Sequence, residues 1–397
     1  MEKKKPQIRF NGFEDEWETT TLGKYFLERV ERSAEGELIS VTISQGVVRT
    51  SDLDRIDNSS NDKSNYKVVE VGDIAYNSMR MWQGACGYSL YKGICSPAYT
   101  VVIPQNNIDV VYCFYLFKRN ETLQLFRVNS QGLTSDTWNL KYPAFSQIKC
   151  SFPSIPEQEK IGVFLTTLDK LIAKLEAKLD KLRRLKQALL EKMFINVSGG
   201  YEAPQIRFKG YTDKWQVKEL REVATKHSIS NQHVHHQNLL SLSYGKIKRK
   251  DINSNKGLLP ASFDTYQMVK EGVVVMRFTD LQNDKKSLRV GLAKEEGIIS
   301  PAYVCIYGKE SINADFLYQE LHYYDSILKL FYSMGDGMRQ TLSYTDITTM
   351  PISTPQMEEQ KKVVDIYDTL DRKITQTDTK LTKLRNIKQS LLQKMFA

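Results

Sequence analysis

The chain has 397 residues, a formal net charge of +9 and a hydrophobic fraction of 41%. This length allows two to three domains, each able to bury its own core, and the composition excludes a disordered chain. The excess of 56 basic over 47 acidic residues favours a polyanionic partner, nucleic acid first, although many proteins carry such a charge for solubility alone.

The cysteines and the apolar segments indicate the compartment. The five cysteines are odd in number and form no C-x-x-C pair, which argues against a disulfide framework and a thiolate zinc site. No stretch approaches the roughly 18 apolar residues of a membrane span. The basic N-terminus is followed by no apolar signal segment. We therefore expect a cytoplasmic protein.

Residues 1–152 predict a first globular domain of mixed α/β type with many short strands. Segments 38–43 and 99–103 have strand composition and are bounded by Gly, Ser, Pro and Asn. Residues 108–125 are apolar with helical spacing and predict one helix. The segment 51–64 is dense in Asp, Asn and Ser and predicts an exposed loop.

Residues 153–200 predict a long helix. From 161 to 193 the apolar positions recur in steps of four and three, the a/d pattern of a coiled coil, with Lys186 as the one polar d position. Acidic residues in the first turn suit the helix dipole, and Gly199-Gly200 ends the helix.

The same plan then returns. Residues 201–350 predict a second globular domain, and residues 351–397 a second long helix whose stripe is interrupted by Thr377 and Lys388. Pro6 to Phe10 reappears as Pro204 to Phe208, and the helix endings also match, whereas the middles have diverged. The chain is therefore a tandem duplication. Retained ends around different middles suit a protein that reads two versions of one kind of ligand.

A narrow apolar stripe on each of two equally long helices implies that the helices pack on each other; packing of each only on its own domain is less favoured. The short connection 195–204 cannot return along a rod of roughly 55 Å, so we expect an antiparallel pair with the domains at opposite ends. The expected core of this helix pair consists of Leu168, Ile172, Leu175, Leu179, Leu182, Leu189, Leu370, Ile374, Leu381, Leu384 and Leu391.

No catalytic motif is found. The sequence lacks a P-loop, G-x-G-x-x-G, H-E-x-x-H and G-x-S-x-G, and it lacks the Asn-Pro-Pro-Tyr or Asp-Pro-Pro-Tyr tetrapeptide of amino-methyltransferases. His227, His233, His235 and His236 form a cluster without a cysteine or carboxylate at ligand spacing, so a solvated loop is favoured over a metal site. We expect no catalytic residue, metal or cofactor in this chain.

What remains is binding chemistry. A basic cluster follows a probable strand at 239–244 and suits phosphate contact, although a solvated strand edge is the more favoured interpretation of the cluster by itself. The matching place in the first copy carries side chains able to reach base edges. Two polar turns, 132–139 and 335–340, precede the helices and could enter a DNA groove. The candidate DNA-binding residues are Ser44, Gln45, Arg49, Arg80, Trp82, Thr134, Asn139, Lys246, Lys248, Arg249, Lys250, Arg277, Arg339 and Gln340.

The whole chain resembles the specificity subunit of type I DNA restriction-modification systems. The resemblance rests on the duplicated order of domain and long helix. It also rests on Gly72-Asp73-Ile74, on Gly93 to Tyr99, on Pro153 to Gln158 and on the endings Lys186 to Phe194 and Lys388 to Phe396. The second copy departs from the pattern where Gly272-Val273-Val274 lacks the Asp and where Met357 to Gln360 replaces the Pro-Glu-Gln form.

The resemblance implies an α+β fold: two mixed α/β target-recognition domains separated by two long helices that form an antiparallel coiled coil with pseudo-twofold duplication. Each domain would read one half of a split site on double-stranded DNA. The helices would dock two methyltransferase (modification) subunits, which carry S-adenosylmethionine and methylate adenine N6. Two restriction (translocase) subunits, using ATP with Mg, can join. The chain itself would be non-catalytic. The alternatives are a stand-alone bivalent DNA-binding regulator and an enzyme with an unrecognised active site.

Overall fold

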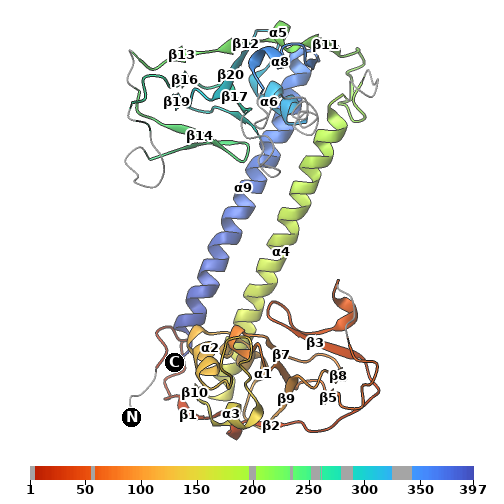
Figure 1. The fold of residues 1–397 in the computed structure, drawn as a ribbon, viewed down its shortest axis with the longest axis vertical. Helices are drawn as coiled ribbons and strands as arrows, with labels where there is room; N and C mark the ends of the chain where they lie inside the picture. Colours follow the sequence, from red (N-terminus) through yellow and green to blue (C-terminus); the bar gives the residue numbers. More distant parts are fainter. Residues whose placement is uncertain are drawn as a thin grey trace. The chain divides into compact units, whose positions relative to one another are not determined.

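The computed structural model describes residues 5–54, 59–195, 203–232, 236–251, 260, 262–278, 289–323 and 342–397 (Figure 1). The chain forms two compact units. Unit 1 consists of residues 1–177 and 378–397, and unit 2 of residues 178–377. Each unit combines one mixed α/β domain with part of each long helix.

Two four-stranded sheets build the domain of unit 1. One has the order β2-β9-β6-β7 and is antiparallel; the other has the order β4-β3-β8-β5 and contains one parallel pair, β3 with β8. A two-stranded sheet, β1 with β10, joins the start of the domain to its end. The strands are β1 (Glu18–Thr21), β2 (Phe26–Glu28), β3 (Leu38–Thr42), β4 (Gly46–Arg49), β5 (Lys67–Val69), β6 (Ile74–Asn77), β7 (Cys86–Tyr88), β8 (Gly93–Cys95), β9 (Tyr99–Pro104) and β10 (Lys149–Phe152).

Strands β3 and β9 confirm the two strand predictions, but the single helix predicted at 108–125 is wrong. The segment forms α1 (Val110–Leu116) and α2 (Asn120–Val128), followed by the short α3 (Tyr142–Gln147). The break has a physical reason. At Arg119 the backbone is extended, with φ −68° and ψ 147°, which interrupts the helix, and the amine of the preceding Lys118 donates to the carbonyls of Ile43 and Gly84. The predicted loop 51–64 is mostly exposed where it is described.

The domain of unit 2 repeats this plan. Its sheets have the orders β12-β20-β17-β18, β13-β16-β19 and β14-β15, and β11 pairs with β21 as β1 does with β10. A parallel bridge between Leu239 and Ile298 takes the place of the parallel β3–β8 pair. The strands are β11 (Gln216–Glu219), β12 (Ala224–His227), β13 (Ile229–Ser230), β14 (Leu240–Ser243), β15 (Lys246–Arg249), β16 (Gln267–Val269), β17 (Val273–Arg277), β18 (Val290–Leu292), β19 (Gly297–Ile299), β20 (Tyr303–Gly308) and β21 (Pro351–Thr354); the short helices are α5 (Leu220–Val223), α6 (Ala314–Tyr323) and α8 (Tyr344–Ile347).

A glycine lies at the parallel strand contact of each domain, Gly93 in the first and Gly297 in the second. A Cβ on Gly93 would collide with the backbone oxygen of Glu37, and a Cβ on Gly297 would lie 2.6 Å from the backbone oxygen of Asn238. The same two carbonyls accept the next backbone N–H, from Ile94 and from Ile298, at 2.8 and 2.9 Å. The repeated Gly-Ile pair is therefore required by close backbone approach.

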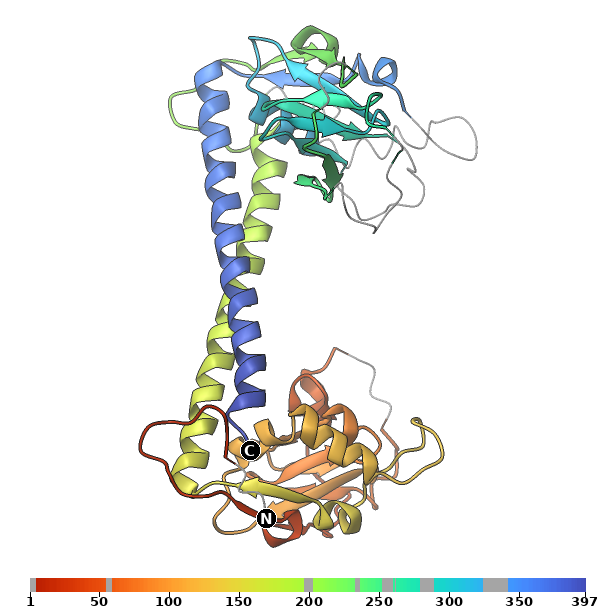
Figure 2. The same ribbon diagram turned by 90° about the vertical axis from the view of Figure 1, so that its left-hand side faces the viewer.

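Two long helices, α4 (Ile155–Met193) and α9 (Met357–Lys394), contribute to both units and run in opposite directions in each (Figure 2). In unit 1, Asp169 pairs with Lys388 at 2.5 Å, and Glu176, further along α4, pairs with the earlier Arg385 at 2.5 Å. In unit 2, Lys186 pairs with Asp371 at 2.7 Å, whereas Phe194 packs against the earlier Tyr367. The antiparallel helix pair and the mixed α/β class are therefore confirmed.

The repeated N-terminal phrase clamps each domain to the first turn of its helix. Arg9 donates two bonds of 2.8 Å to Glu157, and Arg207 donates two of 2.7 and 2.9 Å to Glu359. These hydrogen bonds raise the pKa of both arginines above the usual value. Each glutamate is about 1% exposed, so the repeated Arg compensates a buried carboxylate.

The neighbouring glutamines repeat a second clamp. Gln158 accepts the backbone N–H of Asp109 at 3.0 Å, and Gln360 accepts that of Asn313 at 2.7 Å. Met357 to Gln360 therefore keeps the Glu-Gln pair that makes these contacts. The departure from the Pro-Glu-Gln form changes only the residue before the pair.

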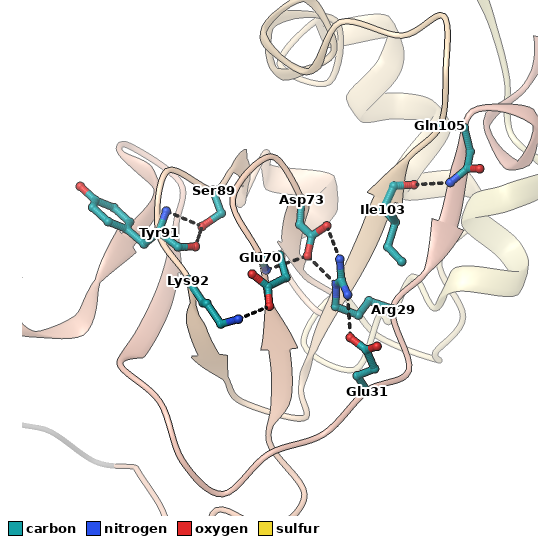
Figure 3. A network of polar contacts seen from close by, with 9 residues as sticks. All are labelled: Arg29, Glu31, Glu70, Asp73, Ser89, Tyr91, Lys92, Ile103 and Gln105. Atoms are coloured by element: carbon teal, nitrogen blue, oxygen red, sulfur yellow. Dashed lines mark hydrogen bonds and ion pairs between the residues drawn. The ribbon is translucent and has the colours of Figure 1, made fainter.

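Asp73 of the Gly-Asp-Ile phrase has a structural role (Figure 3). It is buried, and its carboxylate accepts two hydrogen bonds from the Arg29 guanidinium, of 2.6 and 3.0 Å, and one of 2.8 Å from the backbone N–H of Glu70. The hydrogen bond that Arg29 donates to Asp73 is the main reason that the pKa of Arg29 is raised. In the second copy Val273 is fully buried at the matching place, so an apolar side chain replaces this ion pair.

Candidate functional site

The β3–β4 hairpin turn presents two of the predicted residues. Ser44 and Gln45 are exposed in this turn, whose shape is held by a 3.0 Å bond from the Gln45 backbone N–H to the Thr42 hydroxyl. Arg49 does not join them. It lies at the far end of β4, 3.2 Å from Glu37 and over the ring of Tyr91, so its guanidinium is already engaged.

A second predicted group gathers at the short helix η3 (Met81–Gln83). Arg80 is exposed there, and the half-buried Trp82 donates its indole N–H to the Met79 carbonyl at 3.1 Å. The Trp82 ring meets the ring of Trp138 edge-to-face at 5.2 Å, and Arg127 of α2 lies 5.2 Å from the Trp138 ring. Sequence reasoning missed Trp138 and Arg127, although Trp138 directly precedes the predicted Asn139.

The loop before α3 carries Thr134 and Asn139. A bridge between Gln131 and Asn139 closes it, and the Thr134 backbone N–H donates to the Thr137 hydroxyl at 3.1 Å. Thr134 is exposed and Asn139 half-buried. Between the ends of this closed loop, Leu133 is 101% exposed. The loop is therefore held by internal hydrogen bonds, and its central residues are exposed to solvent.

Lys118 brings the first two groups together. Its amine donates to the carbonyl of Ile43, in the hairpin turn, at 2.7 Å and to that of Gly84, directly after η3, at 2.6 Å. Trp82 and Trp138 then join η3 to the closed loop. Ser44, Gln45, Arg80, Trp82, Thr134 and Asn139 thus belong to neighbouring segments of unit 1. This surface offers polar tips, an arginine and an aromatic pair, which suits contact with phosphates and base edges.

In unit 2 the predicted basic cluster forms strand β15. Lys246, Lys248 and Lys250 are exposed and alternate along the chain, so they share one face. Among the described residues none of these three lysines forms an ion pair. Arg249 instead pairs with Glu295, and this hydrogen bond lowers the pKa of that carboxyl.

The β14–β15 turn is tight. Tyr244 and Gly245 both have positive φ, 48° and 73°, as in a type I′ hairpin turn. Arg277 is half-buried at the end of β17, a different strand from the lysine face. Arg339 and Gln340 lie outside the described residues, as do His233 and His235.

The predicted helix-pair residues line both helices. In unit 1, Leu168, Ile172 and Leu381 are buried, and in unit 2, Leu179 and Leu370 are buried. The half-buried remainder consists of Leu175, Leu182, Leu189, Ile374, Leu384 and Leu391. The polar interruptions are satisfied: Lys186 and Lys388 pair with aspartates of the opposite helix, and the Thr377 hydroxyl donates to the Lys373 carbonyl at 2.7 Å.

The thiols and the possible metal ligands of the described part of the chain show no further site. All five cysteines are buried free thiols, and burial raises the pKa of Cys86 to about 11. Within the described ranges, no cluster of three or more His, Cys, Asp or Glu could hold a metal ion. In the same ranges, no helix has the length and apolarity needed to cross a membrane.

Comparison with known proteins defines the class. The family model of the type I restriction modification DNA specificity domain matches residues 21–184 and 212–386. The chain belongs to this family. The two matched segments correspond to the two copies of the duplication.

Individual relatives agree with this assignment. The chain is 24% identical over 163 residues to the type I restriction enzyme MjaVIII specificity subunit of Methanocaldococcus jannaschii, covering 39% of this chain and 36% of the relative. It is 22% identical over 312 residues to the MjaIX specificity subunit of the same organism, covering 74% of this chain and 70% of the relative. The crystal structure of the type I restriction-modification S subunit from M. genitalium has the same fold, with a TM-score of 0.60, 16% identity and 99% of both chains covered.

Proposed function

We propose that this chain is the DNA-recognition subunit of a type I restriction-modification complex, and that each domain reads one half of a bipartite DNA site. The observation that carries the proposal is that the two domains share their buried contacts but expose different residues on the matching hairpin. Both domains share the same buried clamps, yet one presents Ser44 and Gln45 at its hairpin turn and the other presents a face of lysines. One scaffold with two different exposed tips suits two different half-sites.

The helix pair supports a docking role for two methyltransferase subunits. On unit 1 the helices expose Val163, Phe164, Leu171 and Ile387. On unit 2, Leu185 is 46% exposed beside an open hollow lined also by Leu189, Phe208, Ile366 and Leu370. Exposed apolar side chains gathered on a pair of helices are typical of a protein interface.

The chemistry in this proposal belongs to the partners. The methyltransferase subunits carry S-adenosylmethionine and methylate adenine N6, and restriction subunits that join the complex use ATP with Mg. This chain supplies only the recognition of the DNA sequence, which agrees with the lack of a recognisable catalytic motif in its own sequence. Its cytoplasmic location stays a prediction.

A stand-alone bivalent DNA-binding regulator is the competing function. Such a protein needs no second partner, and exposed apolar side chains on both parts of the helix pair would then have no use. Finding a neighbouring gene for an Asn-Pro-Pro-Tyr-type methyltransferase would favour the proposal over this rival.

Exchange of one domain tests the proposal. Residues 204–350 are replaced by the equivalent domain of another specificity subunit, the chimera is combined with the methyltransferase, and methylated adenines are mapped across a genome. Only one half of the methylated site should change. Changes in both halves would contradict the assignment of one half-site to each domain, and methylation by the isolated chain would contradict its non-catalytic role.

A further inference from the structure

Each candidate recognition hairpin is anchored at its turn by one polar side chain, from the connection between α1 and α2 in unit 1 and from α6 in unit 2. In unit 1, the Lys118 amine donates to the Ile43 carbonyl at 2.7 Å and to the Gly84 carbonyl at 2.6 Å. In unit 2, the Tyr318 hydroxyl donates to the Gly245 carbonyl at 3.1 Å. All three acceptors are backbone carbonyls, so the bonds to Ile43 and Gly245 fix the position of each turn and leave its side chains unoccupied.

Space filling alone does not account for Lys118. Its amine lies 5.1 Å from the Phe114 ring and is partly removed from water, and this burial lowers its pKa. Lysine is rarely withdrawn from solvent without compensation, because desolvation of the cation is costly. Here the two carbonyls provide the compensation. They belong to the turn that carries Ser44 and to the segment that carries Trp82, so one cation fixes the spacing between two candidate DNA-contacting segments.

The two anchors are not equivalent positions of the duplication. Asp109 and Asn313 cap α1 and α6 through the same kind of side-chain bond, to Tyr112 at 2.6 Å and to Phe316 at 3.0 Å. This match aligns Tyr318 with Phe114. The two copies therefore hold their hairpin turns with different residues. What the two domains have in common is that a side chain from outside the hairpin holds a backbone carbonyl at its turn.

We propose that Lys118 and Tyr318 are positioning residues that set the base preference of their own domain by holding its hairpin turn against the DNA. The inference rests on the proposed function and adds to it the residues that control specificity. Neither side chain needs to touch DNA. A freed turn can adapt to incorrect bases, so discrimination falls more than overall affinity does.

The variants Lys118→Met and Tyr318→Phe test this inference in the full chain, assembled with its methyltransferase. Methylation is measured on a DNA library in which each half-site is randomised in turn. Lys118→Met should lower discrimination at one half-site by about tenfold or more, as expected for loss of bonds from a charged donor. Tyr318→Phe should lower discrimination at the other half-site by about fivefold. In each case the second half-site is the internal control. Lys118→Arg, which keeps donors, should give an intermediate value.

Lys63→Met is the matched control, because Lys63 also donates to a backbone carbonyl, that of Ser60 at 3.0 Å, on an exposed part of the same domain. It should leave both half-sites unchanged. A uniform loss of methylation with unaltered base preference would overturn the inference and leave the proposed function standing. So would equal relaxation of both halves. If Lys118→Met fails to fold, base discrimination by Tyr318→Phe tests the inference, because this variant removes a single oxygen and should keep the fold. If the wild-type complex methylates no bipartite site, the proposed function fails and the inference fails with it.

Discussion

Loss of Arg9 should destabilise unit 1 more than loss of Arg207 destabilises unit 2. Arg9 is the only side chain among the described residues that donates to Glu157, whose carboxylate is about 1% exposed. Glu359 is equally buried but also receives the indole N–H of Trp215 at 3.1 Å. The matching indole N–H, on Trp17, is buried and has no hydrogen-bond partner in the described part of the chain.

The magnitudes follow from these contacts. Removing one partner of a buried ion pair costs about 3–5 kcal/mol, so Arg9→Met should cost about 4 kcal/mol. Both glutamates lie in the first turn of a helix, so the helix dipole stabilises the two carboxylates equally. A hydrogen bond to a charged group contributes about 1.5–3 kcal/mol, so Trp215 should reduce the cost of Arg207→Met to about 2 kcal/mol.

Urea unfolding followed by hydrogen exchange and mass spectrometry separates the two units, because peptides report on each unit individually. Adding Trp215→Phe to Arg207→Met should raise its cost to that of Arg9→Met. The loss in free energy of unfolding caused by Arg9→Met should also become smaller as the pH falls. An unpaired buried carboxyl has a raised pKa in the folded state, so its penalty is relieved by protonation. Equal costs for the two single variants, or a deficit independent of pH, would refute this reasoning.

Two further stability predictions and one binding prediction follow from other contacts. Asp371→Lys should cost about 1 kcal/mol by placing two cations together, and combining it with Lys186→Asp should restore stability in urea titrations; failure of this rescue would contradict a direct pair. Burial raises the pKa of Glu320 to about 7 from 4.5, so its stabilising contribution is complete below pH 4.5 and lost as pH rises through 7. Compared with Glu320→Gln, the wild type should therefore lose on the order of 3 kcal/mol between pH 5 and 9, seen as a falling unfolding midpoint for unit 2. Leu185→Glu should reduce co-purification of the methyltransferase at least about tenfold, whereas Lys181→Glu on the same helix should not.

Features that depend on local sequence were predictable. Apolar spacing located the long helices, and β-branched runs located β3 and β9. The antiparallel course of the helices followed from their apolar stripes and from the short connection 195–204. Lys186 and Lys388 were recognised as polar interruptions, but their partners, Asp371 and Asp169, became identifiable only when the register of the two helices was known.

Features that depend on contacts distant in sequence were not predictable. The break between α1 and α2 falls beside Lys118, whose amine reaches carbonyls of two segments far earlier in the chain. Trp138 and Arg127 were missed because their meeting with Trp82 is a tertiary contact. The sequence groups Arg249 with the lysines of the candidate DNA-binding set, although in the structure it is bound to Glu295.

The division between repeated and unrepeated residues has a physical meaning in this fold. Repeated residues such as Arg9 and Arg207 make buried contacts that any working copy needs. The hairpin turns differ in length, Ile43–Gln45 in one domain and Tyr244–Gly245 in the other, and their anchors differ with them. A change of turn shape moves the carbonyl that must be held, so the anchoring side chain has to change together with the exposed tip. Specificity should therefore transfer between such proteins only when turn and anchor are exchanged as a set, and exchange of the tip residues alone should yield a domain with weakened discrimination.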